Sequence, residues 1–380
     1  MTIKALEFYS GIGGLHLALK RSAVDGEVAC ALDWDQAAAQ VYKANFPATP
    51  VRRVDISTLT ASILQDISPD IDLWLLSPAC QPYTVLNPHG KGEHDPRAQS
   101  FLHLIQTVLP SLVRDHKSPG HLLVENVGGF EHSTTRQLLL SILHDLGYNC
   151  VEFLLTPLQF GIPNSRLRYY LLARHKSFAA MVPGQNDMIM RYIPGHGTGM
   201  PWTDPRSSTC ASTSSEISSV EVKHIREFLD IEDEPGLLIS KYGIPAQVLI
   251  KWGWLFDIVL PEDQRTCCFT RGYTKLVERA GSILQMNGDI DTTQAFRKYQ
   301  EACSSLNPIN AVQLLQPLCL RYFTPEELLR LFGFNDLPTF CSDEEFAWPV
   351  EVSLKTRYRL IGNSVNVHVV QYLLDYLYSQ

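Results

Sequence analysis

Apolar, strand-like runs alternate with amphipathic, helix-like segments over roughly the first 175 residues of the chain. Each run is short and is followed by a polar or glycine-containing turn, which is the pattern of repeated strand–helix units. Such units favour a mostly parallel sheet with helices on both faces. The expected strands cover Ile3–Tyr9, Val28–Leu32, Thr49–Val54, Asp72–Leu76, His121–Val124, Cys150–Leu155 and Leu167–Ala173. This part of the chain is therefore predicted to form an α/β fold.

The pattern changes after about residue 178. Residues 182–222 are rich in Gly, Pro, Ser and Thr, which is typical of a loop or a mobile insertion. Residues 221–310 show a mixed pattern that predicts no clear element order. Further on, Thr324 and Pro325 have the cap and first-turn positions of a helix, and an apolar helix is expected over about 365–378.

Charge and composition exclude several classes of protein. The chain has 40 acidic and 32 basic residues, a formal net charge of −8, whereas a protein that coats nucleic acid is usually basic. Any nucleic acid must therefore bind to local basic patches. No apolar run approaches the 18 residues of a membrane span, and the N-terminus lacks the layout of a secretory signal, so an intracellular protein is expected. There is no CxxC pair, which argues against a zinc ribbon or a thioredoxin-like site. No bound metal is expected.

A glycine loop follows the first expected strand. Gly11, Gly13 and Gly14 would let backbone amides approach a ligand, although many strand-to-helix turns also need glycine. Asp33 ends the second strand about 20 residues later, where a carboxylate meets ribose hydroxyls in nucleotide-binding folds. Asp55 ends the third strand. Each acid alone is typical of a helix cap, but together with the loop they favour an adenosine-containing cofactor.

A cysteine stands in a proline-bracketed turn, Ser77-Pro78-Ala79-Cys80-Gln81-Pro82, after a strongly apolar strand. Ligands of open α/β sheets gather at the carboxyl ends of the strands, where this turn is expected. A thiol with a pKa of ~8.5 is only a few per cent ionised near neutrality, so catalysis by Cys80 would need activation. The alternative is that Cys80 is a small core residue.

Two further polar groups are expected at the same sheet edge. Glu125-Asn126-Val127 follows the next strand, and its carboxyl group could protonate or hydrogen-bond a substrate atom. Alone, Glu125 would more simply be a helix cap or a salt-bridge partner. Arg166 and Arg168 alternate onto one face at a strand start, where they suit a phosphate or a pyrimidine carbonyl. The alternative for them is a solvated basic edge.

These motifs, in this order, resemble those of the cytosine-5 methyltransferases. The matching segments are Phe8-Tyr9-Ser10-Gly11-Ile12-Gly13-Gly14, the Pro-x-Cys-Gln turn, Glu-Asn-Val, Arg-x-Arg and Gly362-Asn363-Ser364. The stretches 162–169, 268–273 and 358–370 resemble the DNA methyltransferase 2 type, the tRNA-aspartate cytosine-5 methyltransferases. Several motifs in order are far more specific than one. One departure is Ala79, where the family has a second proline, which frees the backbone before Cys80.

The resemblance implies a fold and a reaction. The fold would be a Rossmann-like S-adenosylmethionine-dependent methyltransferase sheet with a smaller target-recognition domain. The reaction would be methylation of cytosine C5 in tRNA, at cytosine 38 in the anticodon loop of tRNA-Asp. Cys80 would attack cytosine C6 to form a covalent adduct and Glu125 would assist at N3. Arg166 would hold the O2 carbonyl or support Glu125, and Arg168 would orient the loop.

The resemblance also assigns binding residues. Those that would bind S-adenosylmethionine are Phe8, Gly11, Ile12, Gly13, Gly14, Asp33, Trp34, Asp55, Ile56, Ser77, Asn363 and Ser364. Those that would contact nucleic-acid phosphates are Arg265, Arg271, Lys275, Lys355 and Arg357. Cys268 resembles a second family-typical cysteine, and it is equally well interpreted as a structural thiol.

The expected organisation has three parts. Residues 1–178 would form the catalytic, cofactor-binding domain, residues 179–315 the target-recognition domain, and residues 316–380 a segment returning to the catalytic domain. The protein is expected to be a monomer in the cytoplasm, the nucleus or both. The alternatives are a DNA cytosine-5 methyltransferase, a non-catalytic RNA-binding protein that retains the fold, and a nicotinamide-dependent dehydrogenase.

Overall fold

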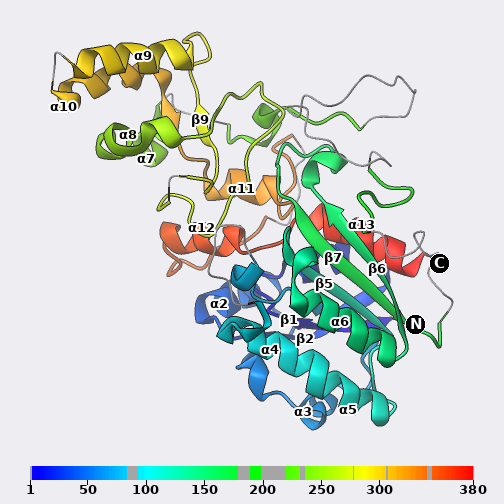
Figure 1. Cartoon of the computed structure of the whole chain (residues 1–380). Coiled ribbons are helices and arrows are strands. Elements are labelled where there is room, and N and C mark those ends of the chain that lie inside the picture. Colours follow the sequence, from blue (N-terminus) through cyan, green and yellow to red (C-terminus); the bar gives the residue numbers. More distant parts are fainter. Residues whose placement is uncertain are drawn as a thin grey trace, which may run out of the picture.

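A seven-stranded sheet forms the centre of the molecule (Figure 1), with strand order β3-β2-β1-β4-β5-β7-β6. The computed structural model describes residues 2–83, 92–178, 189–197, 220–231, 236–276, 278–304, 307–339 and 345–379. The strands are β1 (Ile3–Phe8), β2 (Gly26–Asp33), β3 (Val51–Arg53), β4 (Leu73–Leu76), β5 (His121–Val127), β6 (Tyr148–Leu155) and β7 (Arg168–His175). Strands β1 to β5 pair in parallel, and β7 runs antiparallel to both β5 and β6. The predicted α/β fold with a mostly parallel sheet is confirmed.

Helices cover both faces of this sheet, as Figure 1 shows. The helices of this part are α1 (Gly14–Arg21), α2 (Gln36–Asn45), α3 (Ala61–Ile67), α4 (Gln99–His103), α5 (Leu109–Arg114), α6 (Thr134–Asp145) and α13 (Val367–Tyr378). Successive side chains of a strand point to opposite faces. Accordingly, Ala5 of β1 belongs to the core cluster that includes α1, α2 and α13, and the next residue, Leu6, belongs to the cluster that includes α3 to α6.

Strand β5 is longer than the sequence suggested. All seven of its residues are buried, and the ladder with β7 continues through Glu125, which lies opposite Tyr170. The prediction that Glu125-Asn126-Val127 follows the strand is therefore wrong. Their polar side chains are typical of a turn, but here they have partners inside the fold, since Asn126 donates to the Pro78 carbonyl at 3.4 Å. The carboxyl group of Glu125 is thus held on a sheet strand rather than on a loop.

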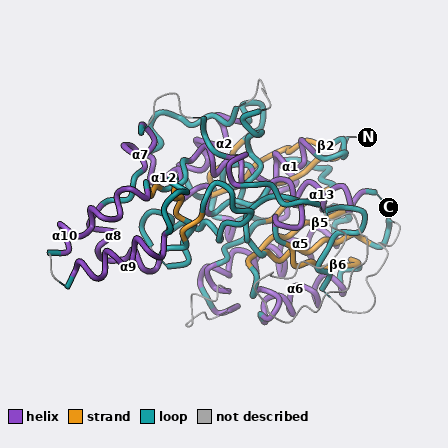
Figure 2. The backbone as a smooth tube through the Cα atoms, turned by 90° about the horizontal axis from the view of Figure 1, so that it is seen from above, coloured by secondary structure: helices purple, strands orange, loops and turns teal. Residues whose placement is uncertain are grey.

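A smaller lobe, which lies beside one end of the sheet in both views (Figures 1 and 2), follows the large sheet in sequence. It contains α7 (Leu237–Tyr242), α8 (Ala246–Trp252), α9 (Thr292–Cys303) and α10 (Pro308–Ala311). It also contains a three-stranded sheet of order β10-β9-β8, made by β8 (Ile258–Val259), β9 (Ile283–Gln285) and β10 (Leu320–Arg321). Strand β10 lies past the expected boundary at residue 315. Most of the Ser-rich 182–222 stretch lies outside the described residues.

The last part of the chain returns to the large sheet. It comprises α11 (Pro325–Leu331), α12 (Leu354–Gly362) and α13. Helix α11 begins as predicted, because the Thr324 side chain accepts a hydrogen bond from the Glu327 amide and Pro325 occupies the first turn. Helix α13 packs against α1, so the C-terminal segment covers the element that follows the glycine loop. None of the helices in the described residues is both long and apolar enough for a membrane span.

Candidate active site

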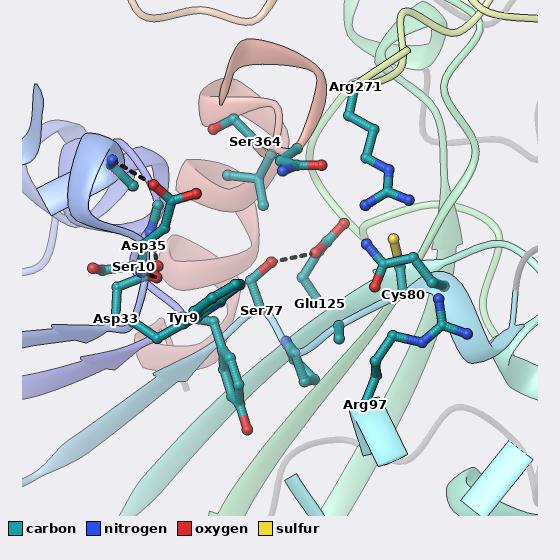
Figure 3. Close-up of a pocket in the computed structure, with 18 of the residues that line it drawn as sticks. Tyr9, Ser10, Asp33, Asp35, Ser77, Cys80, Arg97, Glu125, Arg271 and Ser364 are labelled. Atoms are coloured by element: carbon teal, nitrogen blue, oxygen red, sulfur yellow. Dashed lines mark hydrogen bonds between the residues drawn. The ribbon is translucent and has the colours of Figure 1, made fainter. Parts of the chain in front are cut away.

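A cavity of about 600 Å³ lies at the carboxyl ends of the central strands (Figure 3). It brings together residues of β2 and β5, residues that follow β1 and β4, and residues of the returning C-terminal segment, which are far apart in the sequence. The predicted site residues that line it are Gly11, Ile12, Gly14, Asp33, Trp34, Asp55, Ile56, Ser77, Cys80, Glu125, Arg166, Arg168, Arg271, Asn363 and Ser364. The predicted cofactor-binding and catalytic groups thus share one cavity.

Two residues of the predicted cofactor set do not line this cavity. Phe8 is fully buried in the core, where its ring packs 4.9 Å from that of Trp74. The next residue, Tyr9, lies just past the end of β1 with a φ of 57° and lines the cavity instead. Gly13 instead determines the backbone conformation of the loop. Its φ of 87° lies in the left-handed region, and a Cβ there would lie 2.3 Å from the Phe46 ring.

The carboxylate of Asp33 organises the glycine loop. Its two oxygens accept the backbone N–H groups of Gly11 and Asp35, each at 2.8 Å. Burial raises the pKa of this carboxyl, which backbone hydrogen bonds partly offset. The neighbouring Asp35 caps helix α2 and forms an ion pair with Arg359 of α12. The loop, the end of β2 and the C-terminal segment are therefore joined at this point.

The part of the cavity wall formed by Trp34, Asp55 and Ile56 includes exposed side chains. Trp34 lines the cavity with its side chain 76% exposed, so a wide apolar surface is open to a ligand. Asp55 accepts hydrogen bonds from the amide and hydroxyl of Ser57, which lower the pKa of its carboxyl. Ile56 beside it is buried. This part of the wall offers an aromatic face, a carboxylate and an aliphatic side chain.

Cys80 lies in the turn after β4, where it is half-buried and lines the cavity. The turn is closed by a hydrogen bond from the Tyr83 amide to the Cys80 carbonyl at 3.0 Å. Burial raises the pKa of the Cys80 thiol, while the positive charges of Arg168 and Arg166 act in the opposite direction. The sulfur therefore rests protonated beside groups that favour its thiolate.

Both carboxylate oxygens of Glu125 have a partner. Ser77 donates its hydroxyl to Oε2 at 2.7 Å (Figure 3). The Nε of Arg168 lies 3.4 Å from Oε1. Ser77, predicted as a cofactor contact, thus positions the acid. The guanidinium that pairs with Glu125 belongs to Arg168. The expectation that Arg166 holds the O2 carbonyl or supports Glu125 stays a prediction. A carboxyl fixed in this way can present a proton to a ring nitrogen in the cavity.

Arg166 ties three segments of the chain together. Its side chain is 3% exposed and donates to the carbonyls of Phe269, Gly362 and Ser364. Its guanidinium also lies 4.8 Å from the centroid of the Phe332 ring. Arg166 therefore lines the cavity while joining the small lobe to the C-terminal segment.

The five bases predicted to contact nucleic acid lie in different settings. Arg271 is exposed and lines the cavity (Figure 3), whereas Lys275 and Lys355 are exposed away from it. Arg265 lies 3.9 Å from Asp257, and Arg357 lies 3.7 Å from Glu326. Arg271 is therefore the one base of these five that lines the cavity containing Cys80 and Glu125.

Sequence reasoning missed several lining residues, among them Ser10 and Arg97. Ser10 has a buried hydroxyl with no hydrogen-bond partner among the described residues, although it lines the cavity. Arg97 lines the opposite side and is fixed by Asp95, which accepts from its Nε at 2.8 Å and its Nη2 at 2.6 Å. The Asp95-Pro96-Arg97 spacing was a usable signal, since aspartate before proline commonly begins a turn.

Known proteins resemble this chain over its whole length. The family model for the C-5 cytosine-specific DNA methylase matches residues 3–379. The human tRNA (cytosine(38)-C(5))-methyltransferase is 35% identical over 99% of both chains. A Dictyostelium discoideum DNA (cytosine-5)-methyltransferase is 32% identical over 99% of this chain and 94% of its own. The crystal structure of the S. pombe Dnmt2 methyltransferase superposes with a TM-score of 0.74 at 36% identity, covering 100% of this chain and 99% of that one.

Proposed function

The chain belongs to the C-5 cytosine-specific DNA methylase family and is an enzyme, and we propose that it methylates carbon 5 of a cytosine in tRNA. The observation that carries the proposal is that Cys80 and Glu125 line the same cavity as the glycine loop. A nucleophile and an acid are there beside a site suited to a nucleoside. Neither a dehydrogenase nor a non-catalytic protein has a use for this pair.

S-adenosylmethionine is the methyl donor of this proposal, and it supplies an electrophilic methyl group on a sulfonium. The cavity is within the usual size range of ligand sites, roughly 300–1,000 Å³. The unpartnered Ser10 hydroxyl would hydrogen-bond the amino acid end of the donor. Asp33 would accept ribose hydroxyls, because each of its oxygens has a further lone pair. Trp34 and Ile56 would pack against the adenine.

The residues around Cys80 suit a covalent route. Attack of the Cys80 thiolate on cytosine C6 forms an S–C6 bond and makes C5 nucleophilic. Glu125 protonates or hydrogen-bonds N3, where negative charge would otherwise develop. After C5 has accepted the methyl group, loss of the C5 proton breaks the S–C6 bond and releases the Cys80 sulfur. Arg168 holds Glu125 in place through this cycle.

We further propose that the target is cytosine 38 in the anticodon loop of tRNA-Asp, recognised by residues 179–315. The human relative named for that position supports the proposal. A base in a loop is also easier to extrude into a cavity than a base in a duplex, because less stacking and pairing is lost. Arg271 would contact a phosphate near the extruded nucleotide.

DNA is the second candidate substrate. The family description names DNA, and so does the Dictyostelium relative. The chemistry at Cys80 and Glu125 would be the same for both substrates. An assay in which tRNA-Asp and duplex DNA compete for the enzyme separates the two proposals, and exclusive labelling of DNA would reject the tRNA assignment.

The covalent step is tested with tRNA-Asp that contains 5-fluorocytosine, which blocks loss of the C5 substituent. The wild type should form a denaturant-stable protein–RNA complex in the presence of S-adenosylmethionine, and Cys80→Ala should not. Cys303→Ala, which removes a partly buried thiol in α9, is the matched control and should behave like the wild type. Bisulfite sequencing of ordinary tRNA-Asp should report methylation at cytosine 38. Unchanged methylation by Cys80→Ala would reject the mechanism.

The expected location and assembly remain part of this proposal. We propose a monomer that meets its tRNA in the cytoplasm or the nucleus. Light scattering of the purified protein and imaging of a fluorescent fusion test these two statements separately.

A further inference from the structure

Cys268 lies between the two arginines of the site. Its sulfur is 3.4 Å from Nη1 of Arg166 and 3.6 Å from Nη2 of Arg168. The proposed reaction gives this thiol no role, because Cys80 is the nucleophile. A thiol sulfur accepts hydrogen bonds weakly, whereas a thiolate is a good acceptor for a guanidinium.

Without a charge on the Cys268 sulfur, the positive charges of Arg166 and Arg168 exceed the single negative charge of Glu125. Glu125 pairs with Arg168 at 3.4 Å, and among the described residues no carboxylate forms an ion pair with Arg166, although the charge of Glu125 attracts it. Arg166 is nevertheless almost completely buried and donates to carbonyl oxygens. A buried charge normally needs an opposite charge close by. Two guanidinium groups therefore share one carboxylate, and Cys268 is the ionisable group in contact with both.

We propose that Cys268 is a standing thiolate, the counter-ion of Arg166 and Arg168, and that it acts as a positioning residue for the Glu125–Arg168 pair. With the thiolate present, the cluster of two arginines, Glu125 and Cys268 is neutral. Neutrality lets Glu125 accept and return a proton, because one arginine charge is already balanced. The first statement is independent of the proposed function, and the second rests on it.

The adjacent cysteine shows how specific this setting is. Cys267 faces Ser282 and Asp257, and burial raises the pKa of its thiol to about 12. Burial acts on Cys268 in the same direction, but the charges of Arg168 and Arg166 outweigh it and lower the pKa of this thiol below its usual value. The two neighbours in sequence thus differ in the charges that face them, which makes Cys267 a matched control.

The other titratable groups of the cluster are Glu125 on β5, Cys80 after β4 and Tyr170 on β7. Tyr170 stays neutral, since burial raises the pKa of its hydroxyl. Removing the Cys268 thiolate would leave one arginine charge unbalanced. Because Arg166 and Arg168 both favour a charged Cys80, the extra positive charge would ease ionisation of Cys80 and hinder protonation of Glu125.

The direct test measures thiolate absorbance at 240 nm against pH in the purified protein. The wild type, Cys80→Ser and Cys267→Ser should each retain the absorbance of one thiolate at pH 6.5, and Cys268→Ser should lose it. Thermal melting establishes that Cys268→Ser is folded. Equal absorbance of folded Cys268→Ser and wild type would overturn the proposal. This readout needs neither tRNA nor cofactor, so it is unaffected if the proposed function fails.

A second test addresses the positioning role through methylation of tRNA-Asp. Cys268→Ser should lower kcat by about tenfold or more with little change in KM, and Cys268→Asp, which restores the negative charge, should recover most of the loss. The kcat–pH profile of Cys268→Ser should move to lower pH, whereas a purely structural change would lower the whole profile without moving it. Cys267→Ser should match the wild type. Failure of Cys268→Asp to recover, together with an unmoved profile, would contradict the positioning role.

Discussion

At the residue scale, β1 carries a buried acid that is joined to α1, the helix that follows the glycine loop. Glu7 of β1 is fully buried, accepts the Tyr42 hydroxyl at 2.6 Å and accepts the His16 amide of α1 at 3.2 Å. Burial raises the pKa of this carboxyl to about 8. The usual carboxyl value is about 4.3, so Glu7 keeps its proton on folding over most of the neutral range.

Glu7 should therefore make the protein less stable as the pH rises. Between about pH 4.5 and 8 the folded state holds a proton that the unfolded state has lost, so the free energy of unfolding falls with pH by about 1.4 kcal/mol per unit from this group. Glu7→Gln should remove this contribution. Urea unfolding at pH 5.5, 6.5 and 7.5 should give a smaller decline in the variant than in the wild type. Parallel declines would contradict the assignment, and Glu27→Gln, at an exposed position, is the control.

The residue types of the site could be predicted from the sequence, but their pairings could not. Cys80 and Glu125 follow from motif order and from the ends of apolar runs. The sequence does not reveal that Ser77 bonds Glu125, since serine in that turn is equally suited to a ligand. Ser10 escaped notice for a similar reason, because a small polar residue beside glycines is typical of any turn.

At the scale of elements, the turn from β1 into α1 depends on one backbone conformation. Gly13 caps α1 with a φ of 87°, and the ring of Phe46 from the end of α2 leaves no room for a Cβ. The glycine loop is thus shaped by the helix that follows the next strand.

Gly13→Ala should destabilise the protein and weaken cofactor binding. A left-handed alanine costs on the order of 1 kcal/mol, and the contact with Phe46 adds a further cost of about 1–3 kcal/mol. Gly236→Ala is the matched control, since Gly236 has a φ of 89° but nothing within 4 Å of its Cβ position. Urea unfolding should show a loss several times larger for Gly13→Ala, and calorimetry should show weaker S-adenosylmethionine binding. Equal losses in the two variants would show that Phe46 does not constrain the loop.

Elements were predicted well where periodicity was strong and poorly where polar residues continue a strand. The ends of β1 and α11 agree with the sequence to within a residue or so. The end of β5 does not, because Glu125 and Asn126 are buried and have partners in the turn that follows β4. The small lobe lacked a clear pattern, since its strands have only two or three residues each.

At the scale of the whole molecule, an acidic protein is proposed to bind a polyanion. A net charge of −8 repels RNA at long range, so binding depends on bases near the cavity. Arg271 is exposed at the cavity, whereas the nearby Arg359 is already paired with Asp35.

Arg271→Ala should weaken tRNA binding and make it less sensitive to salt. Loss of one phosphate contact reduces the slope of log K against log salt by about 1. Filter binding of tRNA-Asp between 50 and 300 mM salt measures this slope. Lys4→Ala is the control, because Lys4 is exposed at the opposite end of β1 from the glycine loop. An unchanged slope for Arg271→Ala would place the phosphate contacts elsewhere.

The packing of distant segments against one another could not be predicted from the sequence. The pair of Asp35 and Arg359 joins residues 324 positions apart, and the contact of Arg166 with Ser364 joins residues 198 positions apart. Local patterns say nothing about such contacts. The resemblance supplied the order of the parts, and the structure supplied the contacts that hold them together.

The tethering of Arg166 to Gly362 and Ser364 has a consequence for biosynthesis. A ribosome must have released these late residues from its exit tunnel before the arginine can be seated, so a nascent chain holds every motif of its first half and still lacks a finished reaction centre. A chain truncated before Gly362 should therefore be inactive even with Cys80 and Glu125 intact. Methyl transfer can therefore begin only after Gly362 and Ser364 have been synthesised.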